Sequence, residues 1–150
     1  MRQLSLFKGK RQRGLAPPPP PLEFATHATL ADICKRWIHP HWKFTHLPFG
    51  EEREHRIDAR TGKRYSPTGQ RLQRMGVMPG WPDFIFVGPN AQVFWLELKR
   101  FKTGRLSEDQ SEVLAHLVAC GFSVLVTNSL DDAVATLKQA GILRSNFEVQ

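Results

Sequence analysis

Residues 76–110 constrain the fold of this chain more than any other stretch. Two apolar runs, at residues 84–87 and 93–98, flank the turn-forming residues 88–91 (Gly-Pro-Asn-Ala). Apolar runs of this length on either side of a turn predict two buried β-strands joined as a hairpin. A helix is expected to follow the second strand.

Two acids and a lysine lie at the outer ends of these strands. Positions 83 and 97 are equidistant from residue 90 in the turn, so a hairpin folded there places Asp83 nearly opposite Glu97. Because side chains alternate along a strand, Glu97 and Lys99 face the same side, roughly 7 Å apart at about 3.4 Å per residue. Such groups are costly at the end of a buried strand unless they are paired or bind a metal. The spacing therefore fits a divalent cation beside a phosphate group, with a surface ion pair as the alternative.

The charge of the chain indicates a polyanionic partner. The chain has 150 residues, enough for one domain with its own core. Its 21 Lys and Arg residues against 14 Asp and Glu residues give a net charge of +7, and the isoelectric point is near 9.9. Nucleic acid is the obvious polyanion, although charge alone would fit a ribosomal protein equally well.

Cysteine usage and hydropathy bear on the compartment. Cys34 and Cys120 are isolated thiols, which form neither a disulfide framework nor a CxxC zinc site and so indicate a reducing environment. The sequence contains no apolar run of membrane-spanning length, and its start lacks the apolar core of a signal peptide. We therefore expect a soluble, cytoplasmic protein with no membrane partner.

Residues 1–22 are predicted to form a disordered basic and proline-rich tail, which leaves residues 23–150 as the folded domain. Cations crowd the first thirteen residues, and five prolines follow at 17–21. Such a tail either adds salt-sensitive DNA affinity or serves as a solubilising leader. Within it, Gln3-Leu4-Ser5-Leu6-Phe7 resembles the pentapeptide by which bacterial replication and repair proteins dock on the sliding clamp. In that hypothesis Leu6 and Phe7 fill an apolar pocket and Gln3 bonds at its edge, whereas the alternative is a chance apolar patch.

The region before the hairpin is predicted to begin with a helix over residues 23–38. An apolar stripe recurs at helical spacing, formed by Leu30, Ile33, Cys34 and Trp37. Glu23 at its start either complements the helix dipole or faces the hairpin as a metal ligand. A short strand is expected over residues 42–47. His39 and His41 lack finger-like partners and are expected to be solvated.

Residues 50–68 are polar and aperiodic, which predicts a loop, and a short helix capped by Ser66 is expected to follow it as far as Met75. Seven cations in this region form either a wall that contacts DNA phosphates or a solvated face paired with nearby acids. The seven are Arg53, Arg56, Arg60, Lys63, Arg64, Arg71 and Arg74.

The C-terminal half alternates between helix and strand. We expect a helix over residues 108–120, a buried strand over 122–127 and a second helix over 130–140, with Ser129 as its cap. This order after a hairpin predicts the α/β class, as an α/β/α sandwich with a mixed central sheet.

Three ordered motifs resemble the PD-(D/E)XK nuclease superfamily, and specifically its VRR-NUC branch. They are the glycine-rich approach Gly76–Asp83, the strand Leu96–Lys99 and the segment Gly104–Gln110, within a match that runs from about residue 23 to 143. The resemblance implies a restriction-endonuclease-like fold. It also implies a hydrolase that cleaves DNA phosphodiesters with Mg²⁺ or Mn²⁺.

The resemblance also assigns roles. Asp83 and Glu97 would hold the metal, with the backbone carbonyl of Leu98 as a further ligand. Lys99 would orient or deprotonate the attacking water, or neutralise developing charge. Gln110 would place that water or a phosphate, while also forming a capping box with Ser107.

The resemblance further implies a structure-specific endonuclease for Holliday junctions or flaps, in DNA repair, recombination or phage replication. A homodimer would suit a symmetric junction. The alternatives are a nicking or restriction-like endonuclease, and a nucleic-acid-binding accessory protein that keeps the fold without catalysis.

Overall fold

The computed structural model describes residues 22–48, 56–100 and 104–146. The pentapeptide at residues 3–7, which includes Gln3, Leu6 and Phe7, lies outside these residues, as does Arg53 of the basic set. The clamp-docking hypothesis and the predicted disorder of the tail therefore stay predictions.

The centre of the fold is a mixed four-stranded sheet in the order β1-β4-β5-β6. β1 pairs antiparallel with β4, β4 pairs antiparallel with β5, and β5 pairs parallel with β6. The strands span Lys43–His46 (β1), Phe84–Val87 (β4), Val93–Leu98 (β5) and Ser123–Thr127 (β6).

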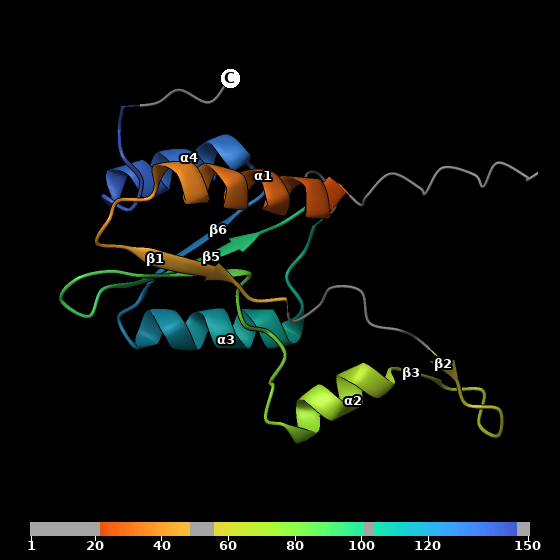
Figure 1. The fold of residues 1–150 in the computed structure, drawn as a ribbon. Helices are drawn as coiled ribbons and strands as arrows, with labels where there is room; N and C mark the ends of the chain where they lie inside the picture. Colours follow the sequence, from red (N-terminus) through yellow and green to blue (C-terminus); the bar gives the residue numbers. More distant parts are fainter. Residues whose placement is uncertain (1–21, 49–55, 101–103, 147–150) are drawn as a thin grey trace, which may run out of the picture.

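Helices cover both faces of this sheet. α1 (Leu22–Trp37) and α4 (Leu130–Gln139) lie side by side on one face, and α3 (Glu108–Ala119) lies on the other (Figure 1). This arrangement confirms the predicted α/β/α sandwich, and the three helices begin and end within one residue of their predicted bounds.

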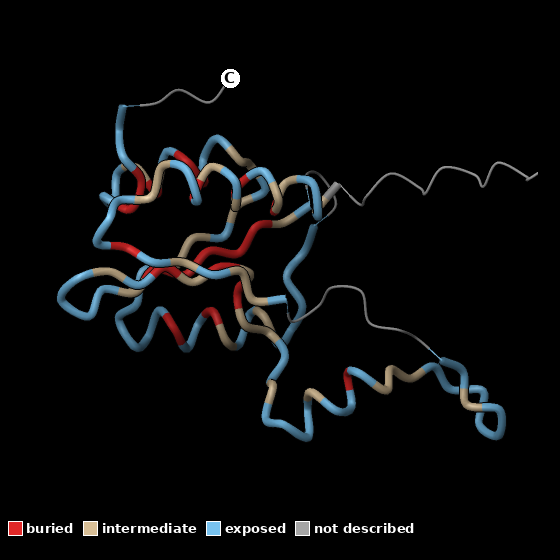
Figure 2. Tube along the Cα trace, in the orientation of Figure 1, coloured by how far each residue is buried: buried red, intermediate tan, exposed pale blue. Residues whose placement is uncertain are grey.

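The main apolar core lies between the sheet and the α1–α4 layer. Phe84, Phe86 and Leu96 in the central strands are fully buried, and they pack against Leu30 of α1 and Leu137 of α4. Figure 2 shows the buried residues concentrated along the central strands and the helix surfaces that face them. The sandwich therefore holds the ends of β4 and β5 rigidly.

The hairpin between β4 and β5 has the expected register. Phe84 lies opposite Leu96 and Val87 opposite Val93, so the pairing is centred on residue 90. Asn90 and Ala91 take left-handed φ values of 55° and 57°, which reverses the chain tightly.

The segment before the hairpin contains structure that the sequence did not predict. Where an irregular loop was expected over residues 50–68, Arg56–Ile57 (β2) and Arg64–Tyr65 (β3) pair as a small antiparallel hairpin. Asp58 forms its turn by accepting the backbone N–H groups of Arg60 and Thr61. Strands of two residues carry no hydrophobic periodicity, so the polar sequence concealed them.

α2 (Pro67–Arg74) follows this hairpin, and Ser66 caps it by accepting the N–H of Gly69, as expected. Together, β2, β3 and α2 project away from the sandwich (Figure 1).

The last strand is less buried than predicted. β6 pairs with β5 and is the final strand of the sheet in the described part of the chain. Val126 is 40 % exposed and Phe122, just before the strand, is 38 % exposed. The expectation of a buried strand over 122–127 was therefore wrong, because an apolar run does not reveal which strand lies at an edge.

Membrane-spanning helices are absent from the described residues: every helix there is too short or too polar to cross a bilayer.

Candidate active site

Asp83 and Glu97 meet at one end of the sheet, as the hairpin register requires. The N–H of Asp83 donates to Glu97 Oε2 over 3.2 Å, and the N–H of Leu98 donates to Asp83 Oδ2 over 2.9 Å. Each carboxylate therefore accepts a backbone hydrogen bond from the opposite chain segment. Glu97 is 1 % exposed, whereas the side chain of Asp83 keeps 21 % of its surface in solvent.

Burial disfavours the charged form of both acids. It raises the pKa of Asp83, although the Leu98 N–H and the nearby His27 and Lys99 oppose this rise. Burial also raises the pKa of Glu97, and the negative charge of the adjacent Asp83 raises it further. Lys99 opposes this rise through its hydrogen bond and its positive charge. Two desolvated carboxylates whose charges repel each other are a favourable place for a cation.

Lys99 and Gln110 complete a compact polar cluster with Glu97. Lys99 Nζ lies 2.5 Å from Glu97 Oε1 and 2.7 Å from Gln110 Oε1. Gln110 Nε2 donates to the same Glu97 oxygen over 2.6 Å. The cluster holds the ammonium group beside the two carboxylates.

Gln110 forms the predicted capping box, and it also makes a contact that the sequence did not predict. It lies in the first turn of α3, where it forms a reciprocal capping box with Ser107. The same side chain contacts Glu97 and Lys99, so the start of α3 is tied directly to the site.

The approach to Asp83 depends on a glycine. Gly80 has a φ of +93°, and a Cβ placed on it would lie 2.4 Å from the carbonyl oxygen of Asp109. The loop thus packs its backbone against the start of α3, which only glycine permits. Trp81 then packs against Trp95 with ring centroids 5.3 Å apart. These contacts fix the chain just before Asp83.

The sequence reasoning missed His27, a residue of α1 that is only 5 % exposed. Its Nε2 lies 3.1 Å from the carbonyl oxygen of Leu98 and 3.5 Å from Asp83 Oδ2. A signal for it was present, because His27 lies one turn after Glu23 on the same face of the helix and three residues before the buried Leu30.

His46 is the last residue of β1, and its Nε2 lies 3.2 Å from Nδ1 of His27. His27, His46 and Asp83 together offer ligand atoms that all lie within 4.8 Å of one another, which is close enough to hold a metal ion.

Glu23 lies close to this site but forms an ion pair. Its Oε2 is 3.7 Å from Nη2 of Arg100, and its side chain is 41 % exposed. Its charge still contributes to raising the pKa of Asp83. Its role as a metal ligand stays a prediction. His39 and His41 are exposed, as expected.

Comparison with known proteins gives a likeness at the level of structure. No protein-family model matches the sequence, and no curated protein matches it. Among solved structures, a chain described as a "VRR_NUC domain protein" matches with a TM-score of 0.55 and 18 % sequence identity. The match covers 78 % of this chain and 85 % of the other. The chain has a VRR-NUC-like fold.

The described members of the predicted basic set lie on the projecting segment of this VRR-NUC-like chain rather than around the carboxylates. All six described members of the predicted basic set are exposed on β2, β3, α2 and the turn between the strands. The six are Arg56, Arg60, Lys63, Arg64, Arg71 and Arg74. Residues 75–82 connect the segment to Asp83, so its cations precede the site directly along the chain.

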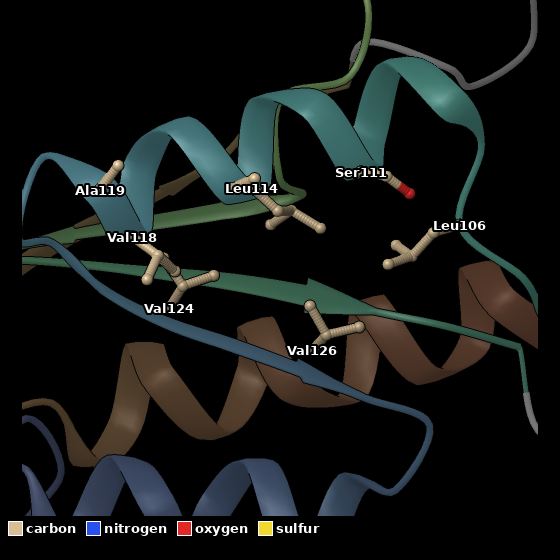
Figure 3. Close-up of a pocket in the computed structure, with 8 residues that line it drawn as sticks. Leu106, Ser111, Leu114, Val118, Ala119, Val124 and Val126 are labelled. Atoms are coloured by element: carbon tan, nitrogen blue, oxygen red, sulfur yellow. The ribbon is translucent and has the colours of Figure 1, made fainter.

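An apolar hollow lies apart from the carboxylate site. It lies between α3 and β6, and Figure 3 shows the aliphatic side chains that line it. They include Leu106, Leu114, Val118, Val124 and Val126. Its lining includes no carboxylate, which separates it from the chemistry at Asp83.

Proposed function

We propose that this protein is a divalent-metal-dependent DNA endonuclease of the PD-(D/E)XK type. The observation that carries the proposal is the pair of opposed, desolvated carboxylates, Asp83 and Glu97, with the ammonium group of Lys99 beside them. The order of these residues along a VRR-NUC-like fold supports it.

The donor set fits a hard divalent cation. Asp83, Glu97 and the Leu98 carbonyl would supply the oxygen ligands that Mg²⁺ and Mn²⁺ accept. Burial raises the pKa of both acids, and a bound cation would stabilise their charged forms. The cation would supply charge stabilisation for the pentacovalent transition state and lower the pKa of water.

The side chains of this protein would position the attacking water. Lys99, held between Glu97 and Gln110, has its ammonium group where it would orient the water or neutralise charge on the phosphate oxygens. Gln110, anchored by the cap of α3, would hold the side chains of Lys99 and Glu97 in position. Attack of the water oxygen on phosphorus breaks one P–O bond of the DNA backbone, and the departing oxygen takes up a proton.

The exposed cations of the projecting segment would contact DNA phosphates. A branched substrate, such as a four-way junction or a flap, offers duplex arms on both sides of a cleavage point, which a projecting basic segment could reach. A homodimer would match the two-fold symmetry of a junction. A nicking or restriction-like activity is the alternative within the same chemistry.

The test uses the purified protein with linear, flap and four-way-junction DNAs in Mg²⁺, Mn²⁺ or EDTA. We expect metal-dependent cleavage of a branched substrate and loss of at least a hundredfold in Asp83→Ala and Lys99→Ala. Asp131→Ala, at an exposed position on α4, is the matched control and should cut normally.

Activity in EDTA, or full activity in Asp83→Ala, would refute the mechanism. Binding without cutting in every metal would instead favour a non-catalytic nucleic-acid-binding protein.

The N-terminal pentapeptide extends the proposal to a partner. A peptide of residues 1–15 should bind a bacterial sliding clamp, and Phe7→Ala should weaken that binding at least tenfold. The absence of binding by the unaltered peptide would remove the clamp as a partner without affecting the nuclease.

A further inference from the structure

We infer that His27 is a nitrogen ligand of the metal site, with His46 as the residue that sets its tautomer, and that the site therefore prefers a first-row transition dication such as Mn²⁺ to Mg²⁺. The inference rests on the proposed function, because it concerns the same metal site.

The position of His27 carries the argument. Its Nε2 faces two oxygen ligands at once, at 3.1 Å from the Leu98 carbonyl and 3.5 Å from Asp83 Oδ2. Adjacent ligands of an octahedral ion with bonds of about 2.1 Å lie about 3.0 Å apart. The three atoms are therefore spaced much as neighbouring ligands of one ion would be.

A purely structural role explains less. If His27 only anchored α1 to the sheet, a hydrogen bond from Nε2 to the Leu98 carbonyl would suffice. It would not require the same nitrogen to approach the carboxylate oxygen of Asp83, nor a second histidine behind the ring. A side chain that is 95 % buried and shared between two acceptors of one site fits a ligand better.

His46 supports His27 from behind. Its Nε2 lies 3.2 Å from Nδ1 of His27, and the two rings meet edge to face with centroids 5.1 Å apart. A ligating imidazole needs its lone pair on the metal side and its hydrogen on the other nitrogen, where a partner accepts it. His46 is placed to be that acceptor. It is therefore a positioning residue rather than a ligand.

The two histidines can change tautomer without a change in net charge. In one arrangement, His27 Nε2–H donates to the Leu98 carbonyl and His46 Nε2–H donates to His27 Nδ1. In the other, His27 carries its hydrogen on Nδ1 and donates it to His46 Nε2, whose own hydrogen moves to Nδ1. Each ring keeps one N–H group in both arrangements. Only the second arrangement leaves a lone pair on His27 Nε2 that can bind a cation.

A nitrogen ligand changes which ion the site selects. Mg²⁺ binds oxygen donors and retains waters, whereas imidazole suits transition metals, whose affinities rise from Mn²⁺ towards Cu²⁺. One imidazole beside Asp83, Glu97 and the Leu98 carbonyl should thus shift the preference from Mg²⁺ towards Mn²⁺.

The test measures metal binding directly, without DNA. Titration calorimetry of the full chain with MnCl₂ and with MgCl₂ should show Mn²⁺ bound at least tenfold more tightly. His27→Gln can still donate a hydrogen bond to the Leu98 carbonyl but offers no nitrogen lone pair, so the Mn²⁺/Mg²⁺ affinity ratio should fall about tenfold. His46→Phe should weaken Mn²⁺ binding by roughly 10- to 100-fold. His39→Gln, at an exposed position, is the matched control and should leave the ratio unchanged.

Pulsed EPR on the unaltered protein with Mn²⁺ is independent of any variant, and it should detect ¹⁴N coupling from a directly bound imidazole. Absence of that coupling while Asp83→Ala still abolishes Mn²⁺ binding would overturn the role of His27 and leave the proposed function intact. Failure of the unaltered protein to bind either ion would overturn both.

Discussion

Asp83→Asn should stabilise the metal-free protein while abolishing its response to metal. The asparagine keeps an oxygen that can accept the Leu98 N–H, but it removes one of two facing negative charges. Side chains directly opposite in a hairpin lie about 5 Å apart, and at an effective dielectric constant near 20 their repulsion is about 3 kcal/mol.

Two effects reduce the stability that is gained by removing this repulsion. Asp83 loses its attraction to the ammonium group of Lys99, and the Leu98 N–H donates to a neutral acceptor instead of a charged one, which costs about 1 kcal/mol. We therefore expect a net gain of about 1–2 kcal/mol, or a rise in Tm of roughly 2–8 °C for a chain of this size.

The sign of the pH dependence follows from the direction of the pKa shifts. Burial raises the pKa of Asp83 and Glu97 in the folded protein, so the folded state binds more protons than the unfolded state between the ordinary carboxyl pKa near 4 and the raised value. This pair therefore favours folding most below pH 4, and that contribution is lost as the pH rises through the raised pKa. The difference in Tm between Asp83→Asn and the unaltered protein should be near zero at pH 4 and largest at neutral pH.

The assay is thermal unfolding in EDTA from pH 4 to 7.5, repeated with Mn²⁺. Mn²⁺ should raise the Tm of the unaltered protein, because it binds only the folded state, and should leave Asp83→Asn unchanged. Glu112→Gln removes one negative charge from an exposed position of α3 and should change stability by less than about 0.5 kcal/mol. A lower Tm for Asp83→Asn at pH 7.5 in EDTA, or a difference that does not grow with pH, would refute the assignment of repulsion to this pair.

Two further substitutions test the supports of the site and the DNA contacts. In chemical denaturation, Gly80→Ala should lower the free energy of unfolding by about 1–3 kcal/mol more than Gly121→Ala does. Both glycines have a positive φ, but of the two only Gly80 has a described backbone atom that an added Cβ would overlap. Equal losses of stability would contradict the close packing. The double variant Arg71→Gln/Arg74→Gln should weaken DNA binding and lower the slope of log K against log salt by about 2, as expected for two lost phosphate contacts. Arg36→Gln, on an exposed face of α1, should leave the slope unchanged; an unchanged slope in the double variant would remove α2 from the interface.

The geometry around the hairpin was predictable because it is local. The turn residues fixed the centre of the pairing, and the alternation of side chains then placed Asp83 opposite Glu97 with no knowledge of the rest of the fold. The capping box of α3 was equally local, since it depends on two residues three positions apart. What the sequence could not supply was the contact of Gln110 with Glu97 and Lys99, because that depends on how α3 docks on the sheet.

Errors occurred where structure depends on distant contacts. β6 has the composition of a buried strand, but the parallel pairing with β5 leaves it at the end of the described sheet. The hairpin of β2 and β3 has no apolar face to signal it, and its turn depends on Asp58 accepting two backbone N–H groups. Composition predicts burial and polarity on average, but neither which strand has a neighbour nor which polar segment folds.

His27 shows how one helical turn decides the chemistry of the site. Glu23 and His27 lie on the same face of α1, about 6 Å apart along its axis, so the sequence alone allows either to reach the sheet. The position of α1 relative to the ends of β4 and β5 determines whether Glu23 or His27 reaches the sheet. The packing of Leu30 and its neighbours in the core fixes that position. At the observed depth, the imidazole of His27 meets Asp83 and the Leu98 carbonyl, while Glu23 pairs with Arg100. If His27 binds the ion as inferred, the ligand type and the preferred ion therefore follow from how α1 packs on the sheet.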